Sequence, residues 1–130
     1  MMYLLDTNAI IAMFRDLHGM REAILKVGFD KCVVSEITLA DLFVGAHKKG
    51  YDAHIHEIRF LQEHFASVPI SNAIEKYAQI RAQLEADGIR LDNFDLLIAA
   101  TALSEGLTLV THNTKHFERI PRLNVRDWEK

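Results

Sequence analysis

Acidic side chains, or an asparagine in place of one, stand at four points where an apolar run ends or a helix is expected to begin. Asp6 and Asn113 follow short apolar runs, whereas Asp41 and Asp95 fall in the expected first turns of helix-like runs. In an open parallel sheet, the carboxyl ends of strands and the starts of the helices that follow them line the same crevice. Carboxylates that gather there repel one another unless a cation lies among them, and hard oxygen ligands suit Mg²⁺ or Mn²⁺. The pattern therefore indicates a metal-dependent phosphodiesterase site.

Each of these acids also has a purely structural interpretation. Asp6 is placed to cap the first helix, and Asp41 stands three residues after Thr38, so that the two would form a pair of the capping-box type. Asp92 is the expected cap of the helix at 92–105, and Asp95, three residues later, is favoured there by the helix macrodipole. Three acids and an amide at one side of one sheet favour the metal site over three unrelated caps.

The elements that must position these residues alternate along the chain. Buried strands are predicted at residues 2–5, 32–34 and 107–110, with a short strand at 67–70 and an edge strand at 123–125. Helices are predicted at residues 8–14, 19–27, from Ser35 or Thr38 to 48, 52–66, 71–86 and 92–105. Thr7 or Asn8 is the expected cap of the first helix. The alternation predicts a single α/β domain over residues 1–130, with a mostly parallel sheet flanked by helices on both faces.

Composition narrows the class of protein. The 130 residues are 49% apolar and 25% charged, as in an ordinary globular domain, and 15 Lys and Arg against 18 Asp and Glu leave a net charge of −3. This balance carries no overall basic signal for nucleic acid, although a bound cation would offset part of it. The single Cys32 excludes an intrachain disulfide, and no run approaches the roughly 18 apolar residues of a membrane span, so we expect a cytoplasmic protein.

Five segments together carry a family resemblance. They are residues 4–8, 35–42 with Gly45, 95–100, 110–113 with Phe117, and the closing stretch 123–128. Over nearly its whole length the chain resembles the PIN-domain ribonucleases, and most closely the VapC-like toxins of bacterial type II toxin–antitoxin modules. The five motifs occur in the order in which the family has them.

The resemblance implies roles for particular residues. Asp6, Asp41 and Asp95 take the positions of the metal-binding acids, Asn113 takes a fourth catalytic position, and the Thr111 hydroxyl steadies the site. The implied activity is an RNA endonuclease that requires Mg²⁺ or Mn²⁺, in which the metal lowers the pKa of a bound water and neutralises charge on the transition state.

Two departures from the family pattern leave alternatives open. The second acid is usually Glu, whereas Asp41 is one methylene shorter, so Glu36, nearer the strand end, is a rival ligand. An acid often precedes the Phe, where this chain has His116. A fold that has lost catalysis and serves as a binding module or RNA-processing factor is therefore the alternative function. A phosphatase or DNA nuclease with the same metal chemistry is a third.

The resemblance also implies protein partners. A small antitoxin is expected to lie in an apolar groove between the helix at residues 8–14 and the helix from Thr38, with Ile11, Phe14, Leu42 and Phe43 as its lining. A homodimer is expected as well, with Phe43, Val44, Phe60 and Phe65 as candidate exposed apolar positions.

Basic and histidine side chains offer weaker signals. Arg90 and Lys115 flank proposed ligands, so they are the preferred contacts to RNA phosphates. His112 and His116 are four residues apart, a spacing that suits a zinc pair only if that stretch is helical.

Overall fold

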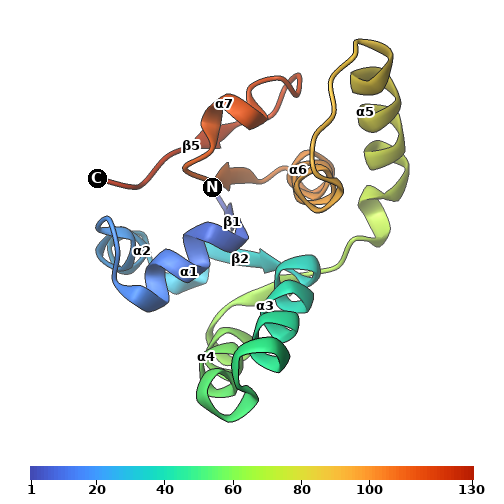
Figure 1. Ribbon diagram of the computed structural model, residues 1–130. Helices are drawn as coiled ribbons and strands as arrows, with labels where there is room; N and C mark the ends of the chain where they lie inside the picture. The colour runs from blue at the N-terminus through green and yellow to red at the C-terminus, as the bar shows by residue number, and fades with distance from the viewer.

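The computed structural model describes all residues 1–130, and its centre is a five-stranded, wholly parallel sheet (Figure 1). The strands lie in the order β3-β2-β1-β4-β5. Their bounds are β1 Tyr3–Leu5, β2 Cys32–Ser35, β3 Ala66–Val68, β4 Thr108–Val110 and β5 Val125–Arg126. The predicted strands are all present, although β3 and β5 are each displaced by one or two residues from their expected bounds.

Seven α-helices and two 3₁₀ turns connect the strands. The helices are α1 Thr7–Arg15, α2 Met20–Val27, α3 Glu36–Lys49, α4 Tyr51–His64, α5 Ile74–Ala86, α6 Asn93–Glu105 and α7 Thr114–Phe117, and the 3₁₀ turns are η1 Phe29–Lys31 and η2 Ser71–Ala73. Asp6, not Thr7 or Asn8, caps α1, and Ser35 caps α3 by accepting the Ile37 N–H. Both caps are the last polar residue before the helix, as capping chemistry requires.

The three central strands, β1, β2 and β4, are buried on both faces, which explains their largely apolar sequence. Leu4, Val33 and Leu109 point to one core, which α5, α6 and the α7 region cover. Their neighbours Leu5 and Val110, with others, point to a second core beneath α1, α2 and α4. Figure 1 shows the same arrangement, with α5 and α6 on one side of the strands and α1 and α2 on the other.

Helix α5 departs from its expected burial. A helix over residues 71–86 with an apolar side would bury Ile74 and Ala82, yet Ile74 is 58% exposed and Ala82 is exposed as well. The reason is that residues 71–73 form the 3₁₀ turn η2, so α5 begins three residues later than expected. Ile80 and Leu84, four residues apart on one face, supply its core contacts.

The strand order places a topological switch point at the middle of the sheet. The chain runs from β1 outward through β2 to β3, and then crosses to the other side of β1 for β4 and β5. Leu5 pairs with Val110 on β4, and the Asp6 N–H donates to the Val110 carbonyl at 3.1 Å. Asp6 and Thr111 therefore leave the sheet side by side at the switch point, where open α/β sheets bind ligands.

None of the helices combines the length and the apolar character needed to span a bilayer.

Candidate metal centre

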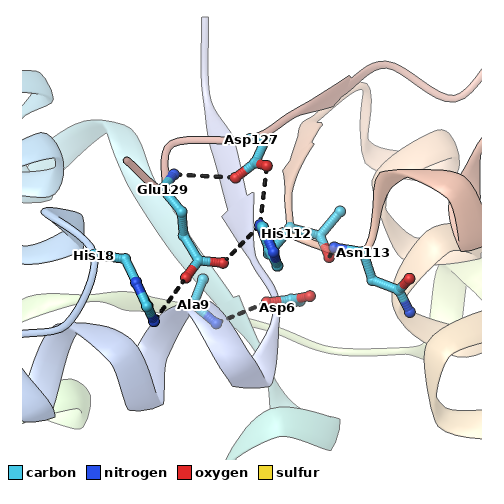
Figure 2. A network of polar contacts seen from close by, with 8 residues as sticks. Asp6, Ala9, His18, His112, Asn113, Asp127 and Glu129 are labelled. Atoms are coloured by element: carbon cyan, nitrogen blue, oxygen red, sulfur yellow. Dashed lines mark hydrogen bonds and ion pairs between the residues drawn. The ribbon is translucent and has the colours of Figure 1, made fainter.

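Asp6 is the most enclosed of the predicted acids. It is 6% exposed, and its Oδ1 accepts the Ala9 N–H at 2.8 Å, so the carboxylate caps α1 while facing the crevice (Figure 2). Burial is the main reason why its pKa is raised, and the charges of Asp95 and Glu129 raise it further, against the lowering effect of Thr111 and of the Ala9 N–H. The capping role that the sequence allowed is therefore real, and it coexists with an unfavourable buried charge.

Asp95 lies in the first turn of α6, just after the cap of that helix. Asp92 is the cap, and its Oδ1 accepts the N–H groups of Phe94 and Asp95 at 2.9 and 3.2 Å. Burial raises the pKa of Asp95, the Asp92 charge raises it further, and His116 lowers it. The buried Nε2 of His116 lies 3.2 Å from Asp95 Oδ2, although no well-aligned hydrogen bond reaches this nitrogen.

Asp41 lies in the second turn of α3, not in the first as the sequence suggested, because α3 begins at Glu36. It is half-buried, and its pKa is raised by burial first and by the Asp92 charge second. The charge of Asp41 in turn raises the pKa of Asp95. Three carboxylates from α1, α3 and α6 thus act on one another, with Asp95 coupled both to Asp6 and to Asp41.

Neither Glu36, the rival ligand, nor Thr38, the proposed capping partner of Asp41, has the contact that the sequence suggested. The Glu36 carboxylate is exposed and accepts the Ile70 N–H at 2.9 Å, which directs it toward the segment after β3. Thr38 does not pair with Asp41 as a capping box, because Ser35 is the cap and the buried Thr38 hydroxyl lies 3.1 Å from the Thr7 hydroxyl. This contact between the two hydroxyls joins α3 to α1 at a point three residues before Asp41.

Asn113 and Thr111 follow β4 at the same edge. Thr111 is fully buried, and its Oγ1 accepts the backbone N–H of Asn113 at 3.0 Å. Asn113 is exposed and occupies the position before α7, and no hydrogen bond joins its side-chain amide to the acids. The structure therefore places Asn113 near the edge of the crevice, while Thr111 lies against Asp6.

Burial and repulsion between neighbouring carboxylates both disfavour the ionised forms of the acids at this site. The pKa values of Asp6, Asp41 and Asp95 are all raised, each by burial first, so the ionised carboxylates are held together at a free-energy cost. Oxygen donors from three separate elements that converge in this way suit a hard divalent cation, which would remove the cost. The donor set fits such a cation.

Three residues contribute to the site in ways the sequence did not predict. Asp92 had been taken only as a helix cap, yet its charge acts on both Asp41 and Asp95. Glu129, near the chain end, acts on Asp6. His116 had been noted as a departure from the family pattern and as a conditional zinc partner of His112, not as a neighbour of Asp95. The signal for Asp92 was its position one turn from Asp95, whereas nothing local linked Glu129 to Asp6.

An open basic hollow adjoins the acids. It has a volume of about 460 Å³, and its charged and polar lining comes from Arg90, Asn113, Lys115, His116 and Arg119. The hollow joins the α5–α6 connection to α7, so the two basic residues preferred from the sequence line one surface.

A second hollow of about 240 Å³ lies between α1, α3 and α4. Ile11, Phe14 and Leu42 line it as expected, and Asp41 forms part of its wall. Phe43 is not among its lining residues, and the Arg59 guanidinium lies over the Phe43 ring at 5.8 Å from its centroid. An apolar hollow of about 430 Å³ beside α2 and α4 shares Phe14 with it.

Among the apolar positions proposed for a dimer face, Phe65 was wrong. It is 3% exposed and packs in the core beneath α4, because the helix ends at His64 and the chain turns inward there. Val44 is 51% exposed, while Phe43 and Phe60 are half-buried.

Comparisons with known proteins agree on one family. The PIN domain model matches residues 3–123. Ribonuclease VapC1 of Haemophilus influenzae (strain R2866) is 36% identical over 135 residues, covering 100% of each chain. The crystal structure of VapBC2 from Rickettsia felis, bound to a promoter DNA fragment, matches with a TM-score of 0.88 and 30% identity over 99% of this chain and 100% of that one. DNA-bound VapBC from Salmonella typhimurium matches with a TM-score of 0.89 and 30% identity over 98% of each chain.

The match extends over the strands that end at the switch point and over the helices that supply all three acids. With full-length coverage of a VapC ribonuclease at this identity, this chain belongs to the PIN-domain family, within its VapC branch.

Proposed function

We propose that this protein is an RNA endonuclease that depends on a divalent cation, Mg²⁺ or Mn²⁺, and acts as the toxin of a type II toxin–antitoxin module. The observation that carries the proposal is the convergence of Asp6, Asp41 and Asp95, with raised pKa values, at the switch point of a PIN fold. The full-length relative named as a ribonuclease supports RNA as the substrate.

Asp6, Asp95 and Asp41 would hold the cation. When bound, a divalent cation supplies Lewis-acid activation of water and offsets charge on the phosphodiester. The Ala9 N–H fixes the Asp6 carboxylate through its Oδ1 atom, and His116 lies against Asp95 Oδ2, so two of the three acids are oriented before the cation arrives. Asn113, at the rim of the site, would act on the substrate.

The basic hollow would receive the RNA backbone. Arg90, Lys115 and Arg119 line it beside Asn113, so that phosphates next to the scissile bond would meet positive charge. This local patch resolves the apparent conflict with a net charge of −3, because only one face needs to be basic.

A small antitoxin would bind the hollow between α1, α3 and α4. Both structural relatives are VapBC complexes, which supports a protein partner. The hollow has apolar lining from Ile11, Phe14 and Leu42 and a charged rim of both signs, with Asp41 and Glu57 beside Arg15 and Lys49. An amphipathic segment that directs an Arg or Lys at Asp41 fits this chemistry. Such a cation would relieve the same repulsion among the acids that a metal relieves.

We also propose a homodimer for the active toxin. Val44 leaves an exposed apolar position on α3, which supports association through that helix. A monomeric mass by light scattering at tens of micromolar protein would contradict this proposal.

One observation favours a second candidate function, a PIN-fold binding module with weakened catalysis. Asp41 reaches one methylene less far than Glu, and it is only half-buried in the second turn of α3. If this reach is insufficient, the fold would still bind RNA through the basic hollow without cutting it.

Incubation with total RNA separates these candidates. The purified chain should fragment RNA with Mg²⁺ or Mn²⁺, should not do so in EDTA, and should leave DNA intact. Expression of the wild-type chain should arrest bacterial growth, and expression of Asp95→Asn should not. RNA binding without cleavage would favour the binding module, and cleavage of DNA would favour a general nuclease.

A further inference from the structure

A second group of metal-ligating side chains lies at the end of the chain, and it shares no residue with the three acids, although the Glu129 charge acts on Asp6. His112 follows β4, whereas Asp127 and Glu129 belong to the segment after β5. His112 Nδ1 lies 3.0 Å from Asp127 Oδ2 and 3.0 Å from Glu129 Oε2 (Figure 2). One nitrogen and two carboxylate oxygens, all within 4.8 Å of one another, therefore converge from two segments.

One proton cannot satisfy this arrangement. A ring nitrogen carries at most one hydrogen, so His112 Nδ1 cannot donate full hydrogen bonds to both carboxylates at once. The two carboxylates also repel one another, and the Glu129 side chain is only 15% exposed, which leaves little water to screen its charge. A cation coordinated by all three groups would satisfy every one of them.

The spacing of the ligand atoms is close to that of a metal site. Ligands at about 2.1 Å from an ion stand roughly 3.0 Å apart in octahedral geometry and roughly 3.4 Å apart in tetrahedral geometry. The two distances of 3.0 Å from His112 Nδ1 are a few tenths of an ångström below the tetrahedral value, and all three ligand atoms lie within 4.8 Å of one another, so coordination would need only small side-chain movements.

The backbone holds the ligands in place. Asp127 Oδ1 accepts the Glu129 N–H at 3.0 Å, and the Lys130 N–H donates to the His18 carbonyl at 2.8 Å. Trp128 packs against Tyr3 in an edge-to-face contact with centroids 4.9 Å apart. On the side away from His112, His18 Nε2 lies 3.7 Å from Glu129 Oε1 and would orient this ligand from outside the coordination sphere.

The mixed donor set distinguishes this group from the acids. Imidazole nitrogen together with carboxylate oxygen suits zinc, whereas an all-oxygen set suits magnesium. We propose that His112, Asp127 and Glu129 bind a zinc ion, which fastens the C-terminal segment to the end of β4. The sequence also allowed a zinc pair of His112 with His116. That pair is wrong, because His112 contacts Asp127 whereas His116 contacts Asp95.

Zinc content and thermal unfolding of the full chain test this inference without RNA. After treatment with EDTA and its removal, the wild-type chain should take up one zinc per chain by elemental analysis. Its melting temperature should rise by roughly 5 to 10 °C when free zinc is about 100-fold above the dissociation constant. His112→Gln, which keeps a donor to the carboxylates but removes the imidazole, should lose both effects.

Three further variants make the result decisive. Glu129→Gln should also lose zinc, while His56→Ala, which removes an exposed histidine from α4, should bind zinc as the wild type does. Asp95→Asn should retain zinc, because this residue belongs to the other site. An equal zinc response in wild type and His112→Gln, a loss of zinc in Asp95→Asn, or no zinc uptake by the wild type would each overturn the inference. Since no nuclease activity is measured, failure of the proposed function would leave this result unchanged.

Discussion

Replacement of Asp6 by Asn should stabilise the metal-free protein while it removes function. Asp6 is 6% exposed and carries a raised pKa, so the folded protein pays for its ionised form. Asn is nearly isosteric and is as good a helix cap as Asp, so the bond from the Ala9 N–H should survive. The substitution therefore removes the buried charge and leaves the local structure in place.

The size of the expected stabilisation depends on opposing contributions to the free energy of the ionised Asp6. The bond from Ala9 and the effect of Thr111 weaken with a neutral partner, whereas the costs of burial and of repulsion by Asp95 and Glu129 disappear. Because the net shift of the Asp6 pKa is upward, the costs exceed the gains. Relief of one destabilised active-site group is worth about 1 kcal/mol, which corresponds to a rise of roughly 3 to 5 °C in the melting temperature of a domain of this size.

The stabilisation by Asp6→Asn should depend on pH. A carboxyl with a folded-state pKa above the ordinary 3.8 favours the folded state when it is protonated, and this benefit is lost as pH rises through the folded pKa. The stability difference between Asp6→Asn and wild type should thus be fully present at neutral pH and should shrink as pH falls toward 3.8.

Thermal unfolding followed by circular dichroism, in EDTA and then in saturating Mg²⁺, is the assay. In EDTA the Asp6→Asn variant should melt higher than wild type. In Mg²⁺ the gap should close or reverse, because only the wild type binds the ion fully. A variant that melts several degrees lower than wild type in EDTA at neutral pH would refute the argument that Asp6 is held at an electrostatic cost.

Three further predictions concern the acids. Asp41→Glu should keep or raise the apparent Mg²⁺ affinity, because it adds one methylene of reach; a loss of affinity in a Mg²⁺ titration would show that the shorter side chain is already at the right distance. Glu36→Ala should cost about 1 kcal/mol of stability through its lost bond to the Ile70 N–H and leave RNA cleavage intact. If it abolishes cleavage while Asp41→Ala does not, Glu36 is the second ligand. Finally, Mg²⁺ affinity should fall on acidification at higher pH than ordinary carboxylates would allow, since the raised pKa values of the acids let protons compete; calorimetric titrations at several pH values would detect an unchanged affinity if this is wrong.

Local sequence was sufficient for the sheet and for most caps. The runs ending at Leu5 and Val110 are apolar on consecutive positions, which only a strand buried on both faces explains. Asp92 was recognised as a cap because its side chain needs only the two backbone N–H groups that follow it. Such features depend on neighbours within a few residues, so the sequence displays them directly.

Contacts between segments that are far apart in the sequence could not be predicted from local patterns. No local pattern relates the residues that make these contacts. The contacts are those between the Thr7 and Thr38 hydroxyls, between the Glu36 carboxylate and the Ile70 N–H, and between Glu129 and His112. In each case the side chain had a plausible local role, and the tertiary partner replaced it. Asp41 was predicted in the first turn of its helix for the same reason. Ser35 and Thr38 were equally suitable caps in the sequence, whereas in the structure Ser35 is the cap and Thr38 contacts Thr7.

The most direct measurement of the central claim is single-turnover RNA cleavage by wild type and Asp95→Asn, at equal folded concentration and with Mg²⁺ or EDTA. We expect wild type to cut RNA only with Mg²⁺, and Asp95→Asn to be folded but slower by roughly 100-fold or more, since even residues outside a metal's first coordination sphere are worth 10- to 100-fold. Cleavage by Asp95→Asn at the wild-type rate, or equal cleavage by the wild type in EDTA, would contradict a metal-dependent nuclease site at these carboxylates.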